Sequence, residues 1–271
     1  MARPFISLLT DFGARDPSAG ILHGVILGIA PEASIVDISH EVRKYAIRDG
    51  ALLLWCAVPY LPVGSHVAVV DPGVGTERRP VAIKTARGDV LIGPDNGLLV
   101  GAAARLGGAT DVHLLQNPEF RLPVVSTSFH GRDIFAPAAA HLARGVELPR
   151  LGPEIDPATL VPSPIPEPVV EAGRLTTSVI YIDTFGNVKL AATRAQLEAA
   201  LGDLAPGARL RVTLGGIDHE IPWRATFGGA AVGTPLLYED SYGRVCLAEN
   251  QGNVAARLGI VDDQAVVIKR D

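Results

Sequence analysis

The chain has 271 residues, of which 48% are hydrophobic and 20% charged, a composition typical of globular proteins with a substantial core. A formal net charge of -5, without a long run of Lys or Arg, argues against a nucleic-acid partner. Cys56 and Cys246 lie far apart among apolar residues, so we expect two buried thiols rather than a disulfide or a metal motif. Neither a signal-peptide core nor an apolar run long enough to cross a bilayer is evident, and we expect a soluble, reduced, cytoplasmic protein without membrane contact.

The first part of the chain alternates between short β-rich runs and helical patterns. We expect strands at residues 5–9, 34–38, 66–70, 81–84 and 90–92, and helices at 19–30, 47–58, 96–106 and 133–143. This alternation predicts an α/β domain with a largely parallel central sheet, which we place at residues 1–160.

Seven prolines within residues 149–168 exclude a helix interior or a central strand there and predict a proline-rich linker, placed at 161–173. The following region contains strand-like runs at 174–182, 208–214, 236–238, 244–248 and 265–269, and one helical pattern at 194–201. Turn signals such as Gly215-Gly216 and Gly228-Gly229 separate these runs. Residues 174–271 are therefore expected to form a smaller, β-rich, barrel-like domain.

An acid, a guanidinium and an imidazole stand at or beside glycine-rich turns in the first domain. Asp71 and Arg78 lie in the run DPGVGTER, and His130 lies in the run FHGRD. Three such groups could orient a water molecule and take its proton, and His130 has the only ordinary pKa near neutrality. The alternative is an exposed loop ion pair beside a capped helix.

Carboxylates also follow three of the expected strands, at Asp11, Asp71 and Asp95, where open α/β sheets bind ligands. Asp11, with Asp16 and Ser18 close behind it, could accept hydrogen bonds from the hydroxyls of a ribose. The alternative for Asp16 and Ser18 is that they cap the next helix. Asp95 lies in the run PDNG, which we interpret as a structural turn.

In the second domain, Asp183, Phe185 and Asn187 combine a carboxylate, an aromatic ring and an amide, which suits the face and edge of a purine, and Phe227 could add a second ring. A plain turn is the alternative. Glycine-rich phosphate and dinucleotide fingerprints are missing, so an unphosphorylated nucleoside is the ligand class that remains. The spacing of the histidines gives little support to a metal site; they fall singly at His23, His40, His66, His113 and His141.

Taken in order, several motifs resemble those of the S-adenosyl-L-methionine (SAM) hydroxide adenosyltransferases, also called adenosine-forming SAM hydrolases, which are related to the fluorinase and the chlorinase. The resemblance covers nearly the whole chain and is carried by LTDFG and DPS near the start, VVDPGVGTERR, GPDNGLL, FHGRDIFAPAAAHLA, IDTFGNV and the region of Tyr242-Gly243. It implies an α/β domain, a C-terminal β-barrel domain and a homotrimer with sites between subunits. It also implies displacement at C5′ of SAM by water or hydroxide, giving adenosine and L-methionine, with SAM as substrate and without a cofactor or metal.

The resemblance assigns roles position by position. Asp71, Arg78 and His130 match the family's water-activating triad, and which of them takes the proton stays open. Asp11 matches the ribose-binding carboxylate, Asp16 and Asp183 match acids near the methionine ammonium, and Ser128 and Phe129 match residues at the ribose and reaction centre. Phe185, Asn187 and Phe227 match the adenine site, and Ser241 and Tyr242 match residues that meet the methionine carboxylate. The chain departs from the family at Lys189-Leu190-Ala191-Ala192, where a Thr-Asn pair is frequent, and at Glu249-Asn250-Gln251.

Three other functions compete with this one. A halogenase of the same superfamily is disfavoured, because those enzymes carry an inserted loop before the PDNG motif and a Tyr-Ser pair where this chain has His130-Gly131. A non-catalytic module that binds SAM or adenosine differs in producing no adenosine from SAM. Metal-dependent hydrolysis would be lost on chelation.

Overall fold

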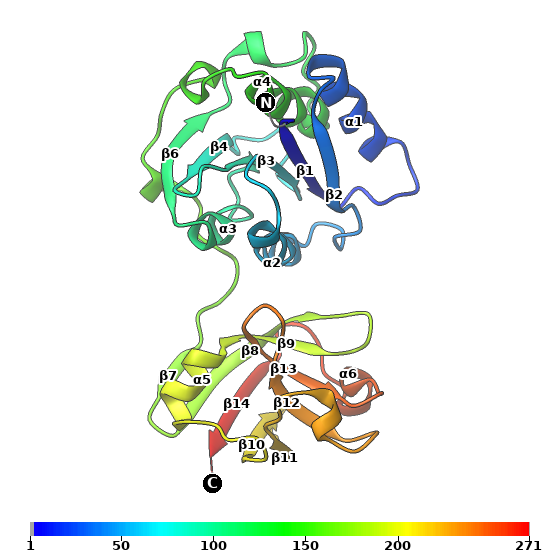
Figure 1. Ribbon diagram of the computed structural model, residues 1–271, viewed down its shortest axis with the longest axis vertical. Coiled ribbons are helices and arrows are strands. Elements are labelled where there is room, and N and C mark those ends of the chain that lie inside the picture. Colours follow the sequence, from blue (N-terminus) through cyan, green and yellow to red (C-terminus); the bar gives the residue numbers. More distant parts are fainter. Residues whose placement is uncertain (1–2, 271) are drawn as a thin grey trace. The chain divides into compact units, whose positions relative to one another are not determined.

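The computed structural model describes residues 3–270, and the chain divides into two compact units between Pro164 and Ile165 (Figure 1). The first unit is built on a six-stranded sheet with the strand order β2-β1-β3-β5-β4-β6. Strands β1, β2, β3 and β5 pair in parallel, and β4 is antiparallel to both of its neighbours. The predicted largely parallel sheet is confirmed. The strands are β1 (Phe5–Thr10), β2 (Ser34–Ser39), β3 (Ser65–Val69), β4 (Pro80–Thr85), β5 (Val90–Pro94) and β6 (Ala109–Leu114).

Helices cover both faces of this sheet, because successive side chains of a strand point to opposite faces and both sets are apolar here. Ile6 and Leu8 pack in a cluster with α1 and α4, whereas Leu9 packs in another cluster with α2 and α3. The ribbon shows the same two layers of helices (Figure 1). The helices are α1 (Ser18–Ile29), α2 (Ile47–Ala57), α3 (Val100–Arg105) and α4 (Ala136–Ala143), the last preceded by a π-helical turn at Gly131–Phe135.

Two details of the first unit differ from the sequence expectation. Strand β6 was not expected, because Gly107-Gly108 directly before it favours a turn and its own residues alternate weakly. The helix expected at 96–106 begins only at Val100, since the side chain of Asn96 accepts from the Leu98 N–H and donates to the carbonyl of Val70. The PDNG run is therefore a structural turn, as predicted.

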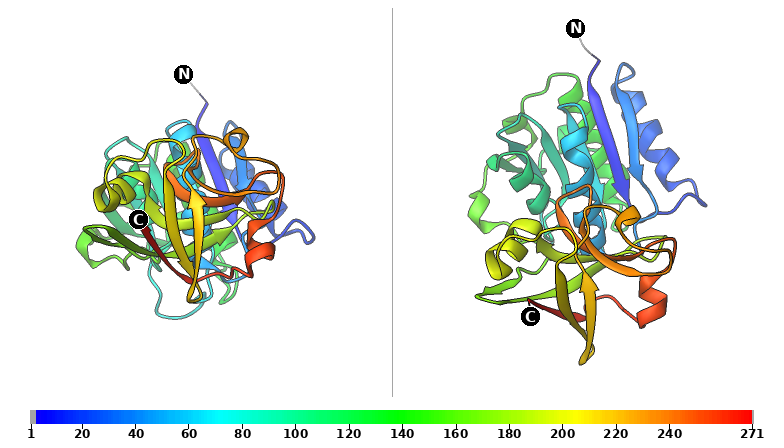
Figure 2. Two further views of the ribbon diagram at one scale, coloured as in Figure 1. Left: turned by 90° about the horizontal axis from the view of Figure 1, so that it is seen from below. Right: turned by 60° about the horizontal axis from the view of Figure 1, so that its bottom comes forward.

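The second unit is an antiparallel sheet with the order β11-β10-β14-β8-β9-β13-β12, to which β7 adds beside β8. A bridge between Trp223, which follows β11, and Leu237 in β12 links the two ends of this order, so the sheet is a nearly closed barrel. Helices α5 and α6 lie on opposite sides of the unit (Figure 2). The elements are β7 (Val169–Glu171), β8 (Arg174–Ile182), β9 (Val188–Thr193), α5 (Arg194–Leu201), β10 (Arg209–Leu214), β11 (Ile217–Pro222), β12 (Pro235–Glu239), β13 (Arg244–Glu249), α6 (Val254–Leu258) and β14 (Ala265–Arg270).

Local sequence explains several boundaries in this unit. Gly215 and Gly216 have positive φ angles of 57° and 84° and form the two-residue turn of the β10–β11 hairpin. Helix α5 begins with a reciprocal capping box between Thr193 and Gln196. Strand β11 was not expected, because its exposed positions are charged and its apolar alternation is short.

The proline-rich segment is held to the first unit before the chain enters the second. Asp95 pairs with Arg79 and accepts from the Val161 N–H at 2.9 Å, and Arg79 also donates to the carbonyl of Thr159. Part of the linker expected at 161–173 is not loop, because residues 169–171 form the edge strand β7.

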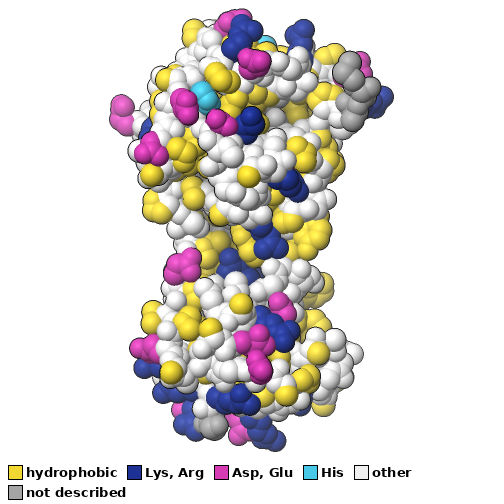
Figure 3. Space-filling model, turned by 60° about the vertical axis from the view of Figure 1, so that its left-hand side comes forward, with side chains coloured by type: hydrophobic (Ala, Val, Ile, Leu, Met, Phe, Trp, Pro, Cys, Tyr) yellow, Lys and Arg dark blue, Asp and Glu magenta, His cyan; other side chains and the backbone are white. Residues whose placement is uncertain are grey.

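Two surface features bear on the expected partners. Among residues 3–270, no helix is both long and apolar enough to span a bilayer. On the face drawn in Figure 3, acidic and basic side chains are interspersed rather than gathered into a basic patch.

Candidate functional site

A cavity in the first unit lies beyond the carboxyl ends of β1 and β3, which are neighbours in the sheet. It brings together most of the site residues predicted for this half of the chain, although they come from three separate segments; Arg78, also predicted, does not line it. These residues are Asp11, Asp16, Ser18, Asp71, Ser128, Phe129 and His130, and the wall also includes Phe12, Lys44, Tyr45, Val69, Val74 and Gly131.

Arg78 connects the acid and the imidazole of the predicted triad. Its Nε donates to Asp71 Oδ1 at 3.1 Å, and its Nη2 donates to Asp71 Oδ2. The same Nη2 lies 3.0 Å from His130 Nδ1. The side chains of Arg78 and Asp71 are only 7% and 5% exposed, so this ion pair is buried and bidentate.

The contact with Arg78 determines which nitrogen of His130 carries the proton. A guanidinium can only donate hydrogen bonds, so Nδ1 of His130 must accept, and the neutral ring then carries its hydrogen on Nε2. Burial, followed by the charge of Arg78, lowers the pKa of His130 below its ordinary value. His130 is therefore a neutral hydrogen-bond donor at physiological pH. Among the described residues, Arg78 Nη1 is buried without a hydrogen-bond partner and retains capacity to donate.

Two features hold the triad loops together. Gly75 has a φ of 78°, and a Cβ at this position would overlap the carbonyl oxygen of Thr127, so only glycine allows the two loops to approach this closely. Asp133, which is fully buried, accepts from both the N–H and the hydroxyl of Ser126 at 2.8 Å, and Ser126 in turn accepts from the Phe129 N–H at 3.0 Å. Asp133 therefore shapes the loop that presents His130, a role that its position in the FHGRD motif did not reveal.

Asp11 forms the opposite wall of the cavity. Its Oδ2 accepts a hydrogen bond from the Tyr45 N–H at 2.9 Å, which orients the carboxylate, and Asp11 as a whole is only 7% exposed. The rings of Phe12 and Phe129 pack edge to face with centroids 5.6 Å apart. Lys44 and Tyr45 were missed as lining residues, because nothing in their sequence context distinguishes them from a surface loop.

Asp16 lies in the cavity and also contacts the start of the next helix. It lines the cavity, and its Oδ1 also accepts from the Ser18 N–H at 3.0 Å at the start of α1. Hydrogen bonds from the backbone and side chain of Ser18 lower the pKa of the Asp16 carboxyl, which is exposed. Asp95, which also follows a strand, has the structural role expected for the PDNG run, since its carboxylate is engaged by Arg79 and Val161.

A second cavity lies in the C-terminal unit and is lined by all six site residues predicted there: Asp183, Phe185, Asn187, Phe227, Ser241 and Tyr242. The Phe185 and Phe227 residues are 75% and 38% exposed, unusual values for phenylalanine. Asp183 organises its own loop, because Oδ1 accepts from the Phe185 and Asn187 N–H groups and Oδ2 accepts from Asn187 Nδ2 at 2.9 Å. The side-chain oxygen of Asn187 is the polar atom left to face a ligand.

Two further polar residues of this cavity were not predicted. Lys189 pairs with Asp240, and Asp240 Oδ1 accepts from the Tyr242 N–H at 2.9 Å and the Arg244 N–H at 3.0 Å. Asp240 thus fixes the turn that carries Ser241 and Tyr242. The departure from the family pattern at Lys189 therefore falls in the wall of the site, where its ammonium lies 5.1 Å from the Tyr242 ring centroid.

Four of the remaining histidines fall into two groups. His66 is fully buried between Ser7 and Asp89, at 2.7 and 2.9 Å, and His113 contacts the carbonyl of Gly152, so both have structural roles. His23 and His40, isolated in the sequence, meet at the carboxylate of Asp37.

Comparison with known proteins identifies the family. Residues 6–152 match the model of the SAM hydroxide adenosyltransferase N-terminal domain, and residues 177–267 match that of the C-terminal domain. The chain belongs to the SAM hydroxide adenosyltransferase family.

Relatives agree with this assignment over nearly the full length. The chain is 44% identical to the (R)-S-adenosyl-L-methionine hydrolase of Salinispora tropica, covering 95% of this chain and 94% of the relative. It is 37% identical to the protein of the same name from Thermus thermophilus, with 96% and 98% coverage, and 30% identical to the fluorinase of Nocardia brasiliensis, with 93% and 92% coverage. The crystal structure of a conserved protein from Thermotoga maritima superposes with a TM-score of 0.90 at 32% identity, covering 98% of this chain and all of that one.

The contact between Gly75 and Thr127 predicts a substitution that separates the triad loops. Gly75→Ala is expected to lower the free energy of unfolding by about 1–3 kcal/mol, because the new Cβ meets the Thr127 carbonyl at a positive φ. Gly108→Ala is the matched control, since Gly108 has a φ of 96° and nothing within 4 Å of the added Cβ. Urea denaturation should rank Gly75→Ala as clearly less stable than Gly108→Ala, and equal losses would contradict the close approach.

Proposed function

We propose that this protein hydrolyses S-adenosyl-L-methionine at C5′, giving adenosine and L-methionine. The observation that carries the proposal is the contact of Arg78 with both Asp71 and His130, two residues that line one cavity with Asp11. The chain is also 44% identical to a named (R)-S-adenosyl-L-methionine hydrolase. The water oxygen forms a bond to C5′ as the C5′–S bond breaks, its electron pair passes to sulfur, and one proton is released.

The chemistry demands little besides positioning. The sulfonium is an activated leaving group that departs as a neutral sulfide, so the protein must hold an oxygen nucleophile in line with the C5′–S bond and limit its hydration. His130 supplies an Nε2–H donor and Arg78 supplies guanidinium donors, while Asp71 fixes and neutralises Arg78. We therefore assign His130 and Arg78 to holding the oxygen, which stabilises hydroxide character, and the released proton passes to solvent. The reaction requires neither a metal nor a cofactor.

The two cavities divide the remaining groups of the substrate between them. Asp11 accepts from the ribose hydroxyls beside Ser128 and Phe129, and Asp16 attracts the methionine ammonium together with Asp183. The exposed rings of Phe185 and Phe227 stack on the faces of the adenine, and Asn187 forms hydrogen bonds with its edge. The turn at Ser241 and Tyr242 contacts the methionine carboxylate. Exposed aromatic rings of this kind are suited to stacking on a flat, uncharged base.

Halide as the nucleophile is disfavoured by the local structure. Strands β4 and β5 form a direct hairpin with Lys84 opposite Val90, which leaves no inserted loop before Pro94, and His130-Gly131 provides donors suited to an oxygen. The fluorinase relative is also more distant than the hydrolases.

The reaction is tested with SAM in ¹⁸O-labelled water. We expect label in the 5′-hydroxyl of adenosine, none in methionine, and full activity after treatment with a chelator, measured by mass spectrometry. S-ribosyl or S-adenosylhomocysteine products would assign another reaction class, and binding without adenosine would make the protein a SAM-binding module.

Two substitutions separate binding from chemistry. Asp11→Ala removes an acceptor for ribose hydroxyls, worth about 1.5–3 kcal/mol per bond, and should chiefly raise the Kd for SAM. His130→Ala should lower kcat by roughly 10²–10⁴ with little change in Kd. Calorimetry and initial rates measure the two effects, and a near-normal kcat for His130→Ala would show that His130 is only structural. Asp11→Asn, which keeps an acceptor for the Tyr45 N–H, checks that the loss in Asp11→Ala is not local misfolding.

We further propose a homotrimer in the cytoplasm, in which each site combines the first unit of one subunit with the second unit of the next. The division of the substrate-binding groups between two cavities on separate units supports this assignment. Sedimentation should give a trimer, and co-expression of Asp11→Ala chains with Phe227→Ala chains should restore part of the activity that each homo-oligomer lacks. An active monomer, or no restoration in verified mixed oligomers, would contradict the shared site.

A further inference from the structure

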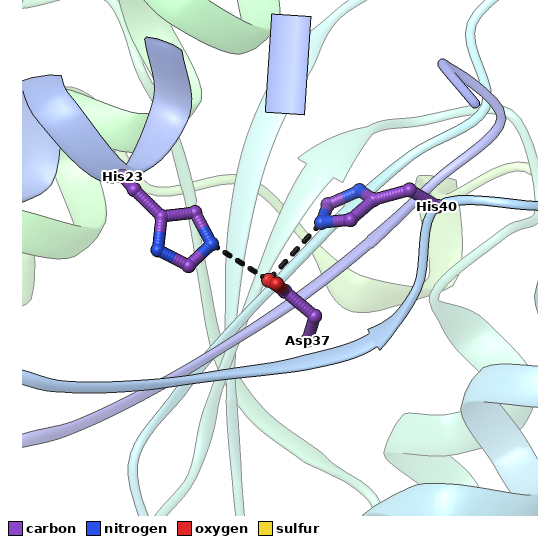
Figure 4. A group of neighbouring side chains, drawn as sticks. All are labelled: His23, Asp37 and His40. Carbon is purple, nitrogen blue, oxygen red and sulfur yellow. Dashed lines mark hydrogen bonds and ion pairs between the residues drawn. The ribbon is translucent and has the colours of Figure 1, made fainter. Parts of the chain in front are cut away.

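Three side chains from separate segments of the first unit meet outside both cavities. His23 comes from α1, Asp37 comes from β2, and His40 follows the end of β2 (Figure 4). His23 Nε2 lies 2.8 Å and His40 Nε2 lies 3.0 Å from the same oxygen, Asp37 Oδ1. The three potential ligand atoms all lie within 4.8 Å of one another.

His40 carries a second, independent signal. Its side chain is only 9% exposed, and its buried Nε2 meets Asp37 Oδ1 at 3.0 Å in a geometry that is poorly aligned for a hydrogen bond. Its other ring nitrogen, Nδ1, lies 2.8 Å from the hydroxyl of Thr10, which fixes the orientation of the ring. A buried ring nitrogen with a poorly aligned partner is only partly satisfied, and an imidazole whose other nitrogen is held by a second group is the usual arrangement of a metal ligand.

We propose that His23, Asp37 and His40 form a binding site for one divalent transition-metal ion, separate from the proposed hydrolytic site. Two imidazole nitrogens and one carboxylate suit Zn²⁺, Cu²⁺ or Ni²⁺, whereas Mg²⁺ and Ca²⁺ prefer oxygen ligands throughout. Bond lengths of about 2.0–2.2 Å in tetrahedral geometry place ligand atoms about 3.4 Å apart. The two nitrogen–oxygen distances of 2.8 and 3.0 Å are close to this value, and the two nitrogens already lie within 4.8 Å of each other.

The surrounding backbone favours such a site. The pairing of β1 with β2 shifts register between Leu8, opposite Asp37, and Leu9, opposite Ser39, and an irregularity of this kind re-aims neighbouring side chains. The side chains of Asp37 and His23 are 43% and 32% exposed, which gives an ion a path from solvent. The carbonyl of His40 accepts from the Gly13 N–H at 2.6 Å, so a bound ion would tie α1 and β2 to the loop after β1.

The test uses the full-length protein after removal of metal by a chelator, titrated with ZnCl₂ by calorimetry and with CuCl₂ under electron paramagnetic resonance. We expect about one ion per chain, coupling of the Cu²⁺ signal to two nitrogens, and a rise in Tm with Zn²⁺. His23→Gln should weaken Zn²⁺ binding by at least about tenfold and leave one coupled nitrogen, and Asp37→Asn should weaken binding comparably.

His219→Gln is the matched control, because His219 lies on β11 in the other unit, and its affinity should equal that of the unaltered protein. Metal-free Tm values of all variants show whether each is folded. No stoichiometric binding, or Zn²⁺ affinity in folded His23→Gln equal to that of the control, would overturn the proposal. Neither result bears on SAM hydrolysis, for which the ¹⁸O experiment provides the separate test.

Discussion

The buried ion pair between Asp71 and Arg78 is the constraint on which the rest of the candidate site depends. Burying two charges is costly. The pair offsets this cost only because the guanidinium donates two parallel hydrogen bonds to the two carboxylate oxygens. Once Arg78 is fixed, His130 has one orientation and one tautomer available. The imidazole is held neutral beside a positive charge and offers an N–H rather than a lone pair, which is why we assign it to binding an oxygen.

The parallel sheet of the first unit makes this arrangement possible. Strands β1 and β3 are neighbours that run in the same direction, so Asp11 and Asp71, each placed just after its strand, emerge at one edge of the sheet. The loop with Asp71 and Arg78 then contacts the loop before His130 where Gly75 passes the Thr127 carbonyl. The sheet therefore places the carboxylates, and two loop contacts place the cation and the imidazole.

Much of this could be predicted from sequence, because strand periodicity, glycine-rich turns and motif order are local properties. The triad, Asp11 and four residues of the second cavity were named on these grounds, and Ser241 and Tyr242 were named from the family resemblance; as site residues they stay predictions, although the structure places all six in that cavity. The roles of Asp133 and Asp240 were not, because each acts through hydrogen bonds to backbone that only the folded loops bring near. Contacts between side chains from different elements could not be predicted either. His23 and His40 share the Asp37 carboxylate only because α1 packs beside β2. Asp95 illustrates the limit of a topological argument, which places the residue at a strand end but does not show that its carboxylate pairs with Arg79.

The protonation state of His130 tests the account most directly. ¹⁵N-histidine labelling of the full chain, with His130→Gln to assign the signal among seven histidines, reports both the tautomer and the pKa by NMR. We predict hydrogen on Nε2, an accepting Nδ1, and a pKa below the ordinary value of about 6.5, because the ring is partly buried and protonation would also place a second positive charge against Arg78. On lowering the pH, the signal of the unprotonated Nδ1 should persist below pH 6.5 before the ring becomes charged. A neutral ring with hydrogen on Nδ1, or a pKa above 6.5, would contradict the proposed role of the Asp71–Arg78 pair.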